Sequence, residues 1–255
     1  MLFYKKIGPE EDVFHKAYDL GLALLLKGPT GCGKSRFVEH MAEKLNRPLV
    51  TVVCNDETSS HDLIGRFLLK GQETVWVDGP VTRAMREGSI LYLDEIVEAR
   101  SDITSILHAL GDYRRSLYID KTNESLKAPK EFMLIASFNP GYQQGLKELK
   151  PSLRQRFLTI EFQYPGADLE IEILNKESGL DEKTCAILVK MANKIRKMED
   201  LQLAETVSTR LLVSTARLMV AGLAYRTAVD VGIFQTISDD PQVIKSLWEV
   251  LSLYF

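Results

Sequence analysis

Residues 22–35, LALLLKGPTGCGKS, join an apolar run to a glycine-rich loop that ends in lysine and serine. The run Leu22–Leu26 predicts a buried strand, and apolar residues at helical spacing over residues 37–45 predict a helix soon after the loop. The loop fits the pattern GxxxxGK[ST] at every fixed position and lies between the strand and the helix, as a phosphate-binding loop requires. We therefore expect the chain to bind the phosphates of a nucleotide.

Each residue type in this loop has a physical reason. Glycines let the backbone wrap around phosphates with its N–H groups inward, and the helix that follows adds donors and the positive end of its dipole. Lys34 is expected to reach the β- and γ-phosphates, and the Ser35 hydroxyl is expected to bind Mg²⁺. The expected nucleotide-binding residues are Gly28, Pro29, Thr30, Gly31, Cys32, Gly33, Lys34, Ser35 and Asp94.

The rest of the chain divides into two kinds of sequence. Apolar runs at 49–53, 90–93, 132–136 and 157–160 predict further strands, and strands that are apolar throughout are typical of a parallel sheet covered on both faces. Residues 166–255 hold only four of the 16 glycines and one of the nine prolines. Apolar stripes at helical spacing predict three helices there: Ile187, Leu188, Met191, Ile195 and Met198; Leu211, Leu212, Leu218, Met219 and Leu223; Val243, Ile244, Leu247, Trp248 and Leu251.

Two carboxylates follow the strand predicted at 90–93. Asp94 can hold Mg²⁺ through its water shell, while Glu95 can orient or deprotonate a water that attacks the γ-phosphate. Kinases that phosphorylate small molecules have less need of an activated water. The pair therefore favours ATP hydrolysis.

Polar residues near the later strands are weaker candidates. Asn139 can hydrogen-bond the γ-phosphate and the attacking water, although an asparagine before proline is more often a turn residue. Arg154 and Arg156 can neutralise transition-state charge at a neighbouring subunit's site, and Arg210 can contact the nucleotide from above. Taken alone, each arginine is more often a solvated surface residue than a catalytic one.

Two segments predict antiparallel hairpins outside the main sheet. Residues 66–69 and 74–77 flank the turn KGQE, and the segment 116–128 contains the turn KTNE. Taken alone, the pattern indicates only hairpins on the protein surface with no assigned role.

The motifs together resemble a known family. GPTGCGKS, ILYLDE, SFNPGYQ, LKPSLRQRF and VSTRLL resemble the MoxR branch of AAA+ ATPases in order and separation, and RFVEHMA and DGPVTRAMREG resemble its CbbQ/NirQ/NorQ subfamily, most of all CbbQ. The resemblance covers nearly the whole chain. It implies an α/β AAA+ core with a central five-stranded parallel sheet over residues 1–165 and an all-α lid over residues 166–255.

The resemblance also implies roles for residues and partners. Asp94 and Glu95 correspond to the Walker B pair, Asn139 to a sensor, Arg154 or Arg156 to the arginine finger and Arg210 to the lid's sensor arginine. The hairpins match the helix-2 and pre-sensor inserts, which implies remodelling loops. Such subunits resemble hexameric ring motors that work with a von Willebrand factor A domain partner similar to CbbO.

The resemblance leaves the client protein open. CbbQ-type members release inhibitory sugar phosphates from Rubisco, and NorQ/NirQ-type members help mature nitric oxide reductase. The overall likeness favours Rubisco as the client.

Charge and composition narrow the choice of partners. The 32 basic and 35 acidic residues give a net charge of −3, which does not favour a nucleic-acid partner. No apolar run approaches a membrane span, the start lacks the long apolar segment of a signal peptide, and three separated cysteines fit a reducing compartment. We expect a cytoplasmic protein with no membrane partner. A small-molecule kinase and a slowly hydrolysing nucleotide switch remain as alternatives.

Overall fold

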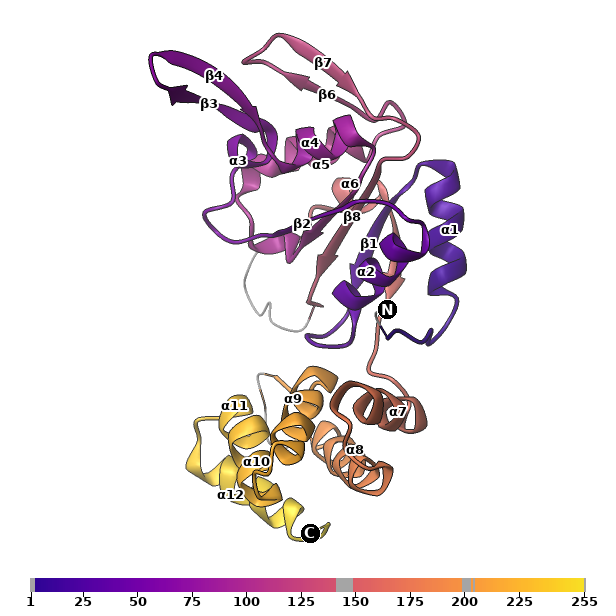
Figure 1. Ribbon diagram of the computed structural model, residues 1–255, viewed down its shortest axis with the longest axis vertical. Helices are drawn as coiled ribbons and strands as arrows, with labels where there is room; N and C mark the ends of the chain where they lie inside the picture. The colour runs from indigo at the N-terminus through magenta and orange to yellow at the C-terminus, as the bar shows by residue number, and fades with distance from the viewer. Residues whose placement is uncertain (1–2, 141–148, 199–202, 204, 255) are drawn as a thin grey trace.

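Five parallel strands form the centre of the N-terminal part (Figure 1). The structure is a computed structural model that describes residues 3–140, 149–198, 203 and 205–254. The strands are β1 (Ala23–Lys27), β2 (Leu49–Val53), β5 (Ile90–Asp94), β8 (Met133–Phe138) and β9 (Phe157–Glu161). They lie in the order β2-β5-β8-β1-β9, with Leu25 paired with Ala136 on one side and with Thr159 on the other. The expected five-stranded parallel sheet is confirmed.

The two edge strands are less buried than their apolar sequences predict. Val53 in β2 is 64% exposed and Leu158 in β9 is 43% exposed. An edge strand has a neighbouring strand on one side only, so its side chains lose part of the cover that central strands receive. The cover predicted for both faces of the sheet is therefore incomplete at its edges, β2 and β9.

Helices cover both faces of the central strands. On one face, α1 (Glu10–Leu20) and α2 (Lys34–Lys44) pack against Leu24, Leu26 and Ile135. On the other face, Leu25, Leu91 and Leu134 belong to the core of the remaining helices. These helices are α3 (Ser60–Ile64), α4 (Pro80–Glu87), α5 (Thr104–Leu110) and α6 (Pro151–Arg154), with the short 3₁₀ turns η1 (Ile96–Glu98) and η2 (Ser101–Ile103).

Two antiparallel hairpins project from the core, as the sequence predicts. One pairs β3 (Gly65–Lys70) with β4 (Glu73–Asp78), and the other pairs β6 (Ser116–Ile119) with β7 (Glu124–Lys127). Gly71 supplies the left-handed backbone of the first turn, with φ of 65°. Both hairpins lie at the end of the core that is farthest from the C-terminal helices (Figure 1).

The C-terminal part is helical and has its own hydrophobic core. It contains α7 (Ala167–Ser178), α8 (Glu182–Arg196), α9 (Thr209–Val220), α10 (Tyr225–Val229), the π-helical turn η5 (Asp230–Phe234), α11 (Gln235–Ile237) and α12 (Pro241–Leu251). Leu188, Leu212 and Leu247, one from each predicted stripe, are fully buried in this core. The three predicted helices are therefore confirmed as α8, α9 and α12.

The second predicted stripe, which ends at Leu223, runs past the end of its helix. Leu223 lies beyond the end of α9 and is 38% exposed. The helix ends sooner because Gly222 adopts a left-handed φ of 95°, which breaks the helical backbone.

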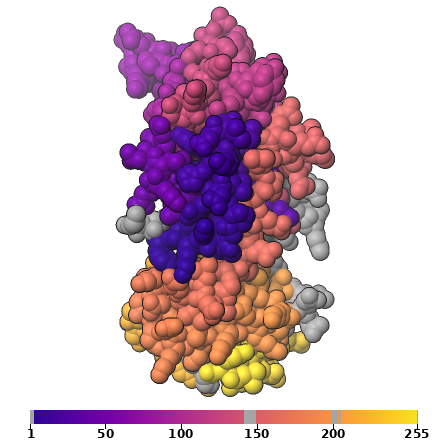
Figure 2. All heavy atoms as spheres, turned by 90° about the vertical axis from the view of Figure 1, so that its right-hand side faces the viewer, coloured from indigo at the N-terminus to yellow at the C-terminus, as the bar shows by residue number. Residues whose placement is uncertain are grey.

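The two parts are joined by a short connection between Glu161 and Ala167. The N-terminal residues lie over the α/β core and reach the C-terminal helices, where Lys5 forms an ion pair with Glu172 of α7 (Figure 2). The division into domains at residues 165 and 166 stays a prediction. None of the helices in the described part of the chain combines the length and the apolar composition that a membrane span requires.

Candidate active site

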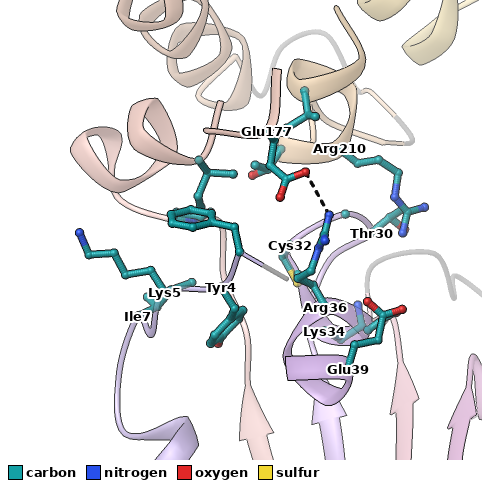
Figure 3. A pocket seen from close by; sticks show the side chains of 18 of the residues that line it. Tyr4, Lys5, Ile7, Thr30, Cys32, Lys34, Arg36, Glu39, Glu177 and Arg210 are labelled. Atoms are coloured by element: carbon teal, nitrogen blue, oxygen red, sulfur yellow. Dashed lines mark hydrogen bonds and ion pairs between the residues drawn. The ribbon is translucent and has the colours of Figure 1, made fainter. Parts of the chain in front are cut away.

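A cavity of about 460 Å³ lies where the α/β core meets the C-terminal helices (Figure 3). Its walls come from the N-terminal segment, the loop between β1 and α2, the ends of β5 and β8, and helices α7 and α9. Cavities of several hundred Å³ hold ligands of nucleotide size. The cavity therefore brings residues from distant parts of the sequence to one ligand-sized space.

The glycine-rich loop forms one wall through its backbone conformation. Gly31 and Gly33 have left-handed φ values of 69° and 103°. A Cβ on Gly31 would lie 2.8 Å from the Ser208 side chain, so only glycine lets this loop approach the start of α9. Of the predicted loop residues, those from Thr30 to Ser35 line the cavity, whereas Gly28 and Pro29 lie behind it.

Lys34 is a buried cation at the base of the cavity. It is 7% exposed, and its Nζ donates to the carbonyls of Gly28 at 2.8 Å and Pro29 at 2.9 Å and to Asn139 Oδ1 at 2.7 Å. Burial lowers the pKa of Lys34. Within the described residues all three acceptors are neutral, so the ammonium has no directly bonded anion, and a phosphate in the cavity would supply one.

Asn139 contacts two residues of the glycine-rich loop, Lys34 and Thr30. Besides accepting from Lys34, its Nδ2 donates to Thr30 Oγ1 at 3.2 Å. The structure thus brings the predicted sensor amide to the cavity wall. The segment 141–148, which includes part of the SFNPGYQ motif, lies outside the described residues.

Asp94 is held at the end of β5 by three hydroxyl groups. Its Oδ2 accepts from Ser35 Oγ at 3.1 Å, and its Oδ1 accepts from Tyr92 OH at 2.7 Å and from Ser137 Oγ. Hydroxyl and carboxylate oxygens are the donor type that Mg²⁺ prefers. Ser35 and Asp94 therefore fit a magnesium ion shared with phosphates.

Glu95 follows Asp94 in a strained backbone conformation. Its φ of 55° and ψ of 46° are left-handed, and its N–H donates to Ser137 Oγ at 3.2 Å. Burial and the neighbouring Asp94 raise the pKa of the Glu95 carboxyl. In the part of the chain that the structure describes, this carboxylate has no hydrogen-bond partner, so it is available to a water in the cavity.

Arg210 enters the cavity from the first turn of α9. Its side chain extends from α9 beside Thr30 (Figure 3). A second polar group joins the two parts nearby, where Glu177 of α7 accepts from Arg36 of α2 at 3.3 Å and from Arg217 of α9 at 3.1 Å. Both parts of the chain therefore contribute arginines to the cavity lining, Arg36 from α2 and Arg210 and Arg217 from α9.

Arg154 and Arg156 do not reach this cavity. Arg156 Nη1 donates to the Ser152 carbonyl at 2.9 Å, and the Arg154 guanidinium lies 6.0 Å from the centre of the Phe138 ring. Neither residue lines the cavity of its own chain. Their role at a neighbouring subunit and the choice between them stay predictions.

Several residues at the cavity were not predicted. Ser137 bonds both Asp94 and the Glu95 backbone, and Tyr164 OH donates to the Thr30 carbonyl at 3.0 Å. Ser137 lies two positions before Asn139, so the alternation of a strand could have indicated that both face the same way. For Tyr4, which lines the cavity from the N-terminal segment, the sequence holds no comparable signal.

Comparisons with known proteins agree with this geometry. Residues 23–157 match the family described as the AAA domain of the dynein-related subfamily, and residues 170–254 match the CbbQ/NirQ/NorQ C-terminal family. The chain is 52% identical over 253 residues to Protein NorQ of Paracoccus denitrificans (strain Pd 1222), which covers 99% of this chain and 94% of that protein.

Two other relatives have different names. The Denitrification regulatory protein NirQ of Stutzerimonas stutzeri is 49% identical over 99% of this chain and 92% of its own length. Protein CbbQ of Hydrogenophilus thermoluteolus is 46% identical over 96% of this chain and 92% of its own length.

A solved structure bears on the fold. A Cytophaga hutchinsonii protein described as an ATPase superposes with a TM-score of 0.53 over 94% of this chain and 80% of that chain, at 17% identity. At that identity the likeness supports the shared fold alone.

Proposed function

Because the chain belongs to the AAA ATPases that carry a CbbQ/NirQ/NorQ C-terminal region, we propose that it couples ATP hydrolysis to the remodelling of a client protein. ATPase activity and nucleotide binding come with membership of the family. The observation that carries the step to a remodelling motor is the joint match of both regions along one chain, with relatives named NorQ, NirQ and CbbQ.

We assign phosphate binding to the loop from Gly28 to Ser35. The backbone N–H groups of the loop and the start of α2 donate to phosphate oxygens, and Lys34 exchanges neutral carbonyl partners for phosphate oxygens. Ser35 and Asp94 are the residues that would hold Mg²⁺, Asp94 through water. Bound there, Mg²⁺ would neutralise charge on the β- and γ-phosphates.

Glu95 is the proposed general base. Its free carboxylate accepts a proton from the attacking water. Asn139 hydrogen-bonds the γ-phosphate, and Arg210 supplies positive charge from the C-terminal helices. A base with a raised pKa holds the transferred proton more firmly than an ordinary carboxylate does. These roles support hydrolysis rather than phosphoryl transfer to a small molecule.

The assembly that we propose is a hexameric ring with a von Willebrand factor A domain partner. Supporting observations are the distance of Arg154 and Arg156 from their own cavity and the projection of two hairpins away from it. An arginine that lies outside its own site can complete the site of a neighbour. The hairpins are the proposed contact with the client, and the β3–β4 hairpin carries exposed Phe67, Leu68 and Leu69.

Rubisco is the first candidate client, with release of inhibitory sugar phosphates as the outcome. Nitric oxide reductase is the second candidate, because identity to the relatives named NorQ and NirQ, at 52% and 49%, exceeds the 46% identity to CbbQ. Both candidates use the same motor, so the difference lies in the partner and the client.

Recovery of inhibited Rubisco tests the assignment. The purified protein, a von Willebrand factor A domain partner and ATP are added to Rubisco with a bound sugar phosphate, and carboxylation is followed over time. We expect recovery with all components and none with the Glu95→Gln variant. Absence of recovery, together with nitric oxide reductase activity that depends on this chain in cells, would replace Rubisco by the second candidate.

A further inference from the structure

One arginine bridges the two hairpins. Arg86 of α4 donates from Nε to Asp78 Oδ2 at 2.7 Å, and from Nη1 and Nη2 to Glu124 at 2.8 and 2.6 Å. Asp78 is the last residue of β4 and Glu124 is the first residue of β7. A single guanidinium therefore joins hairpins that are far apart in the sequence, and opposite charges raise the pKa of Arg86.

The same bridge fixes the aromatic residue of the first hairpin. The other oxygen of Asp78 accepts from Trp76 Nε1 at 2.7 Å, and the Trp76 ring packs edge-on against Phe67 with 5.2 Å between ring centres. Arg86 thus holds the carboxylate that orients the indole.

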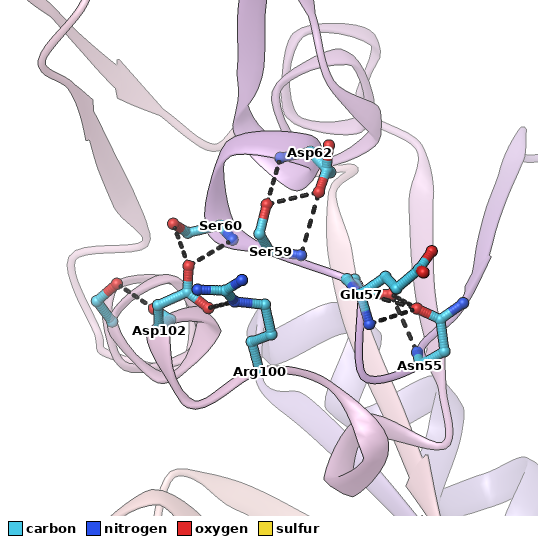
Figure 4. A network of polar contacts seen from close by, with 9 residues as sticks. Asn55, Glu57, Ser59, Ser60, Asp62, Arg100 and Asp102 are labelled. Carbon is cyan, nitrogen blue, oxygen red and sulfur yellow. Dashed lines mark hydrogen bonds and ion pairs between the residues drawn. The ribbon is translucent and has the colours of Figure 1, made fainter.

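A second polar contact joins η2 to the start of α3 (Figure 4). Asp102 in η2 accepts from the backbone N–H and the hydroxyl of Ser60 at 3.0 and 2.9 Å. Ser60 begins α3, which continues directly into β3, whereas η2 continues through α5 towards β6. The Ser59 and Asp62 side chains cap the same turn. The segments that lead into the two hairpins are therefore in contact as well.

We propose that Arg86 is a positioning residue that joins the two hairpins into one client-contacting unit. The client contact rests on the function proposed above, whereas the joining rests on the contacts of Arg86 alone. An isolated two-stranded hairpin is only marginally stable in water, so a shared anchor limits the independent motion of each. Only arginine has a planar fork that can bond two carboxylates in this way, and lysine offers a single point charge.

The distance between the hairpin turns tests this inference. Spin labels are placed on Gln72→Cys and Lys121→Cys, both exposed, while native Cys32, Cys54 and Cys185 are buried. Pulsed electron paramagnetic resonance then gives the distance distribution of the full chain without nucleotide or client. We expect a narrow distribution in the parent, a distribution at least twofold broader in Arg86→Gln, and an intermediate width in Arg86→Lys.

Two further variants separate the bridge from general damage. Arg83→Gln changes an exposed arginine on the same helix, for which the described residues show no side-chain ion pair, and is expected to keep the parent width. Glu124→Gln removes the other side of the bridge and is expected to broaden the distribution even where Arg86→Gln does not fold. Parent widths in both Arg86→Gln and Glu124→Gln would overturn the proposal.

The outcome does not depend on the proposed client. The sample contains neither ATP nor client, so a rigid pair of hairpins is measured whether or not the hairpins touch Rubisco. Failure of the Rubisco assay would reject the client, and unchanged widths would reject the bridge.

Discussion

At the scale of single residues, Glu95 differs from its neighbour Asp94. Asp94 accepts from three hydroxyl groups, whereas the Glu95 carboxylate has no hydrogen-bond partner among the described residues. Asp94 is thereby fixed, and Glu95 is left free to accept a proton. The surroundings of two adjacent carboxylates thus suit them to different roles, Asp94 to holding Mg²⁺ and Glu95 to accepting a proton.

Replacing Glu95 by glutamine tests that difference. Glutamine has nearly the same shape but cannot accept the proton of the attacking water. We expect Glu95→Gln to bind ATP about as tightly as the parent and to lower kcat by roughly 10²- to 10⁴-fold. Phosphate release and fluorescent-nucleotide binding measure the two effects. Turnover near the parent rate would remove Glu95 from the proposed role.

The pH dependence of turnover should report the same carboxyl. Burial and Asp94 raise the pKa of Glu95, so the carboxyl gains its proton at a higher pH than an ordinary glutamate does. Since only the ionised form can act as a base, kcat should fall as the pH decreases through this raised pKa. The acid limb of the kcat profile should be absent from the residual activity of Glu95→Gln, and its persistence there would assign the limb to another group.

Ser137 is the residue whose contribution the sequence did not indicate. Ser137→Ala removes a donor to the Asp94 carboxylate and the acceptor of the Glu95 backbone N–H, so one carboxylate loses a contact and the backbone that carries the other loses its acceptor. We expect kcat to fall by about 10- to 100-fold. Tyr92→Phe removes only one donor to Asp94 and should cost less. Equal losses in steady-state assays would show that the Glu95 contact has no effect.

At the scale of elements, α9 is positioned by a buried ion pair. Glu170 of α7 is 0% exposed and accepts from Arg196 of α8 at 2.7 and 2.8 Å and from Thr209 Oγ1 at 2.6 Å. Thr209 is the first residue of α9, and Arg210 follows it into the cavity. The contact therefore connects the packing of three helices to the placement of one cavity arginine.

Removing this carboxylate should destabilise the C-terminal helices. Glu170→Ala leaves the Arg196 guanidinium buried without its anion, which we expect to lower the free energy of unfolding by about 3 kcal/mol. Glu172→Ala on the same helix removes a partly exposed ion pair with Lys5 and should cost less than about 1 kcal/mol. Urea unfolding measures both, and equal small losses would contradict the importance of the buried pair.

At the scale of the whole molecule, the cavity of one chain lacks Arg154 and Arg156. Both residues lie around α6, outside the residues that line the cavity. If a neighbouring subunit supplies one of them, hydrolysis requires contact between subunits. Activity should then depend on assembly and not on the single chain.

Dilution and mixing experiments measure this dependence. Turnover per subunit should rise with protein concentration, because more subunits are then in contact. An Arg154→Ala/Arg156→Ala double variant should lower the activity of added parent more steeply than in proportion to its fraction. Glu172→Ala serves as the mixing control. Strictly additive activity would show that each chain hydrolyses ATP alone.

The fold was largely predictable because its signals are local. Strand β1, its loop and α2 are consecutive in the sequence, and apolar runs and helical stripes depend on neighbours a few positions apart. Burial was less predictable where it depends on the position of a strand in the sheet. Val53 and Leu158 are apolar yet exposed because they lie in edge strands.

The sequence by itself determined two parts of the site: the loop that carries Lys34, and the pair Asp94 and Glu95. Each is a run of adjacent residues, so its pattern can be recognised without the fold. Only the tertiary structure decided that Ser137 bonds the Asp94 carboxylate and the Glu95 backbone N–H, that Glu177 lies between Arg36 and Arg217, and that Arg86 joins two hairpins. These contacts bring together side chains from separate elements. Their geometry follows from how the helices and strands pack, which no short pattern of residues encodes.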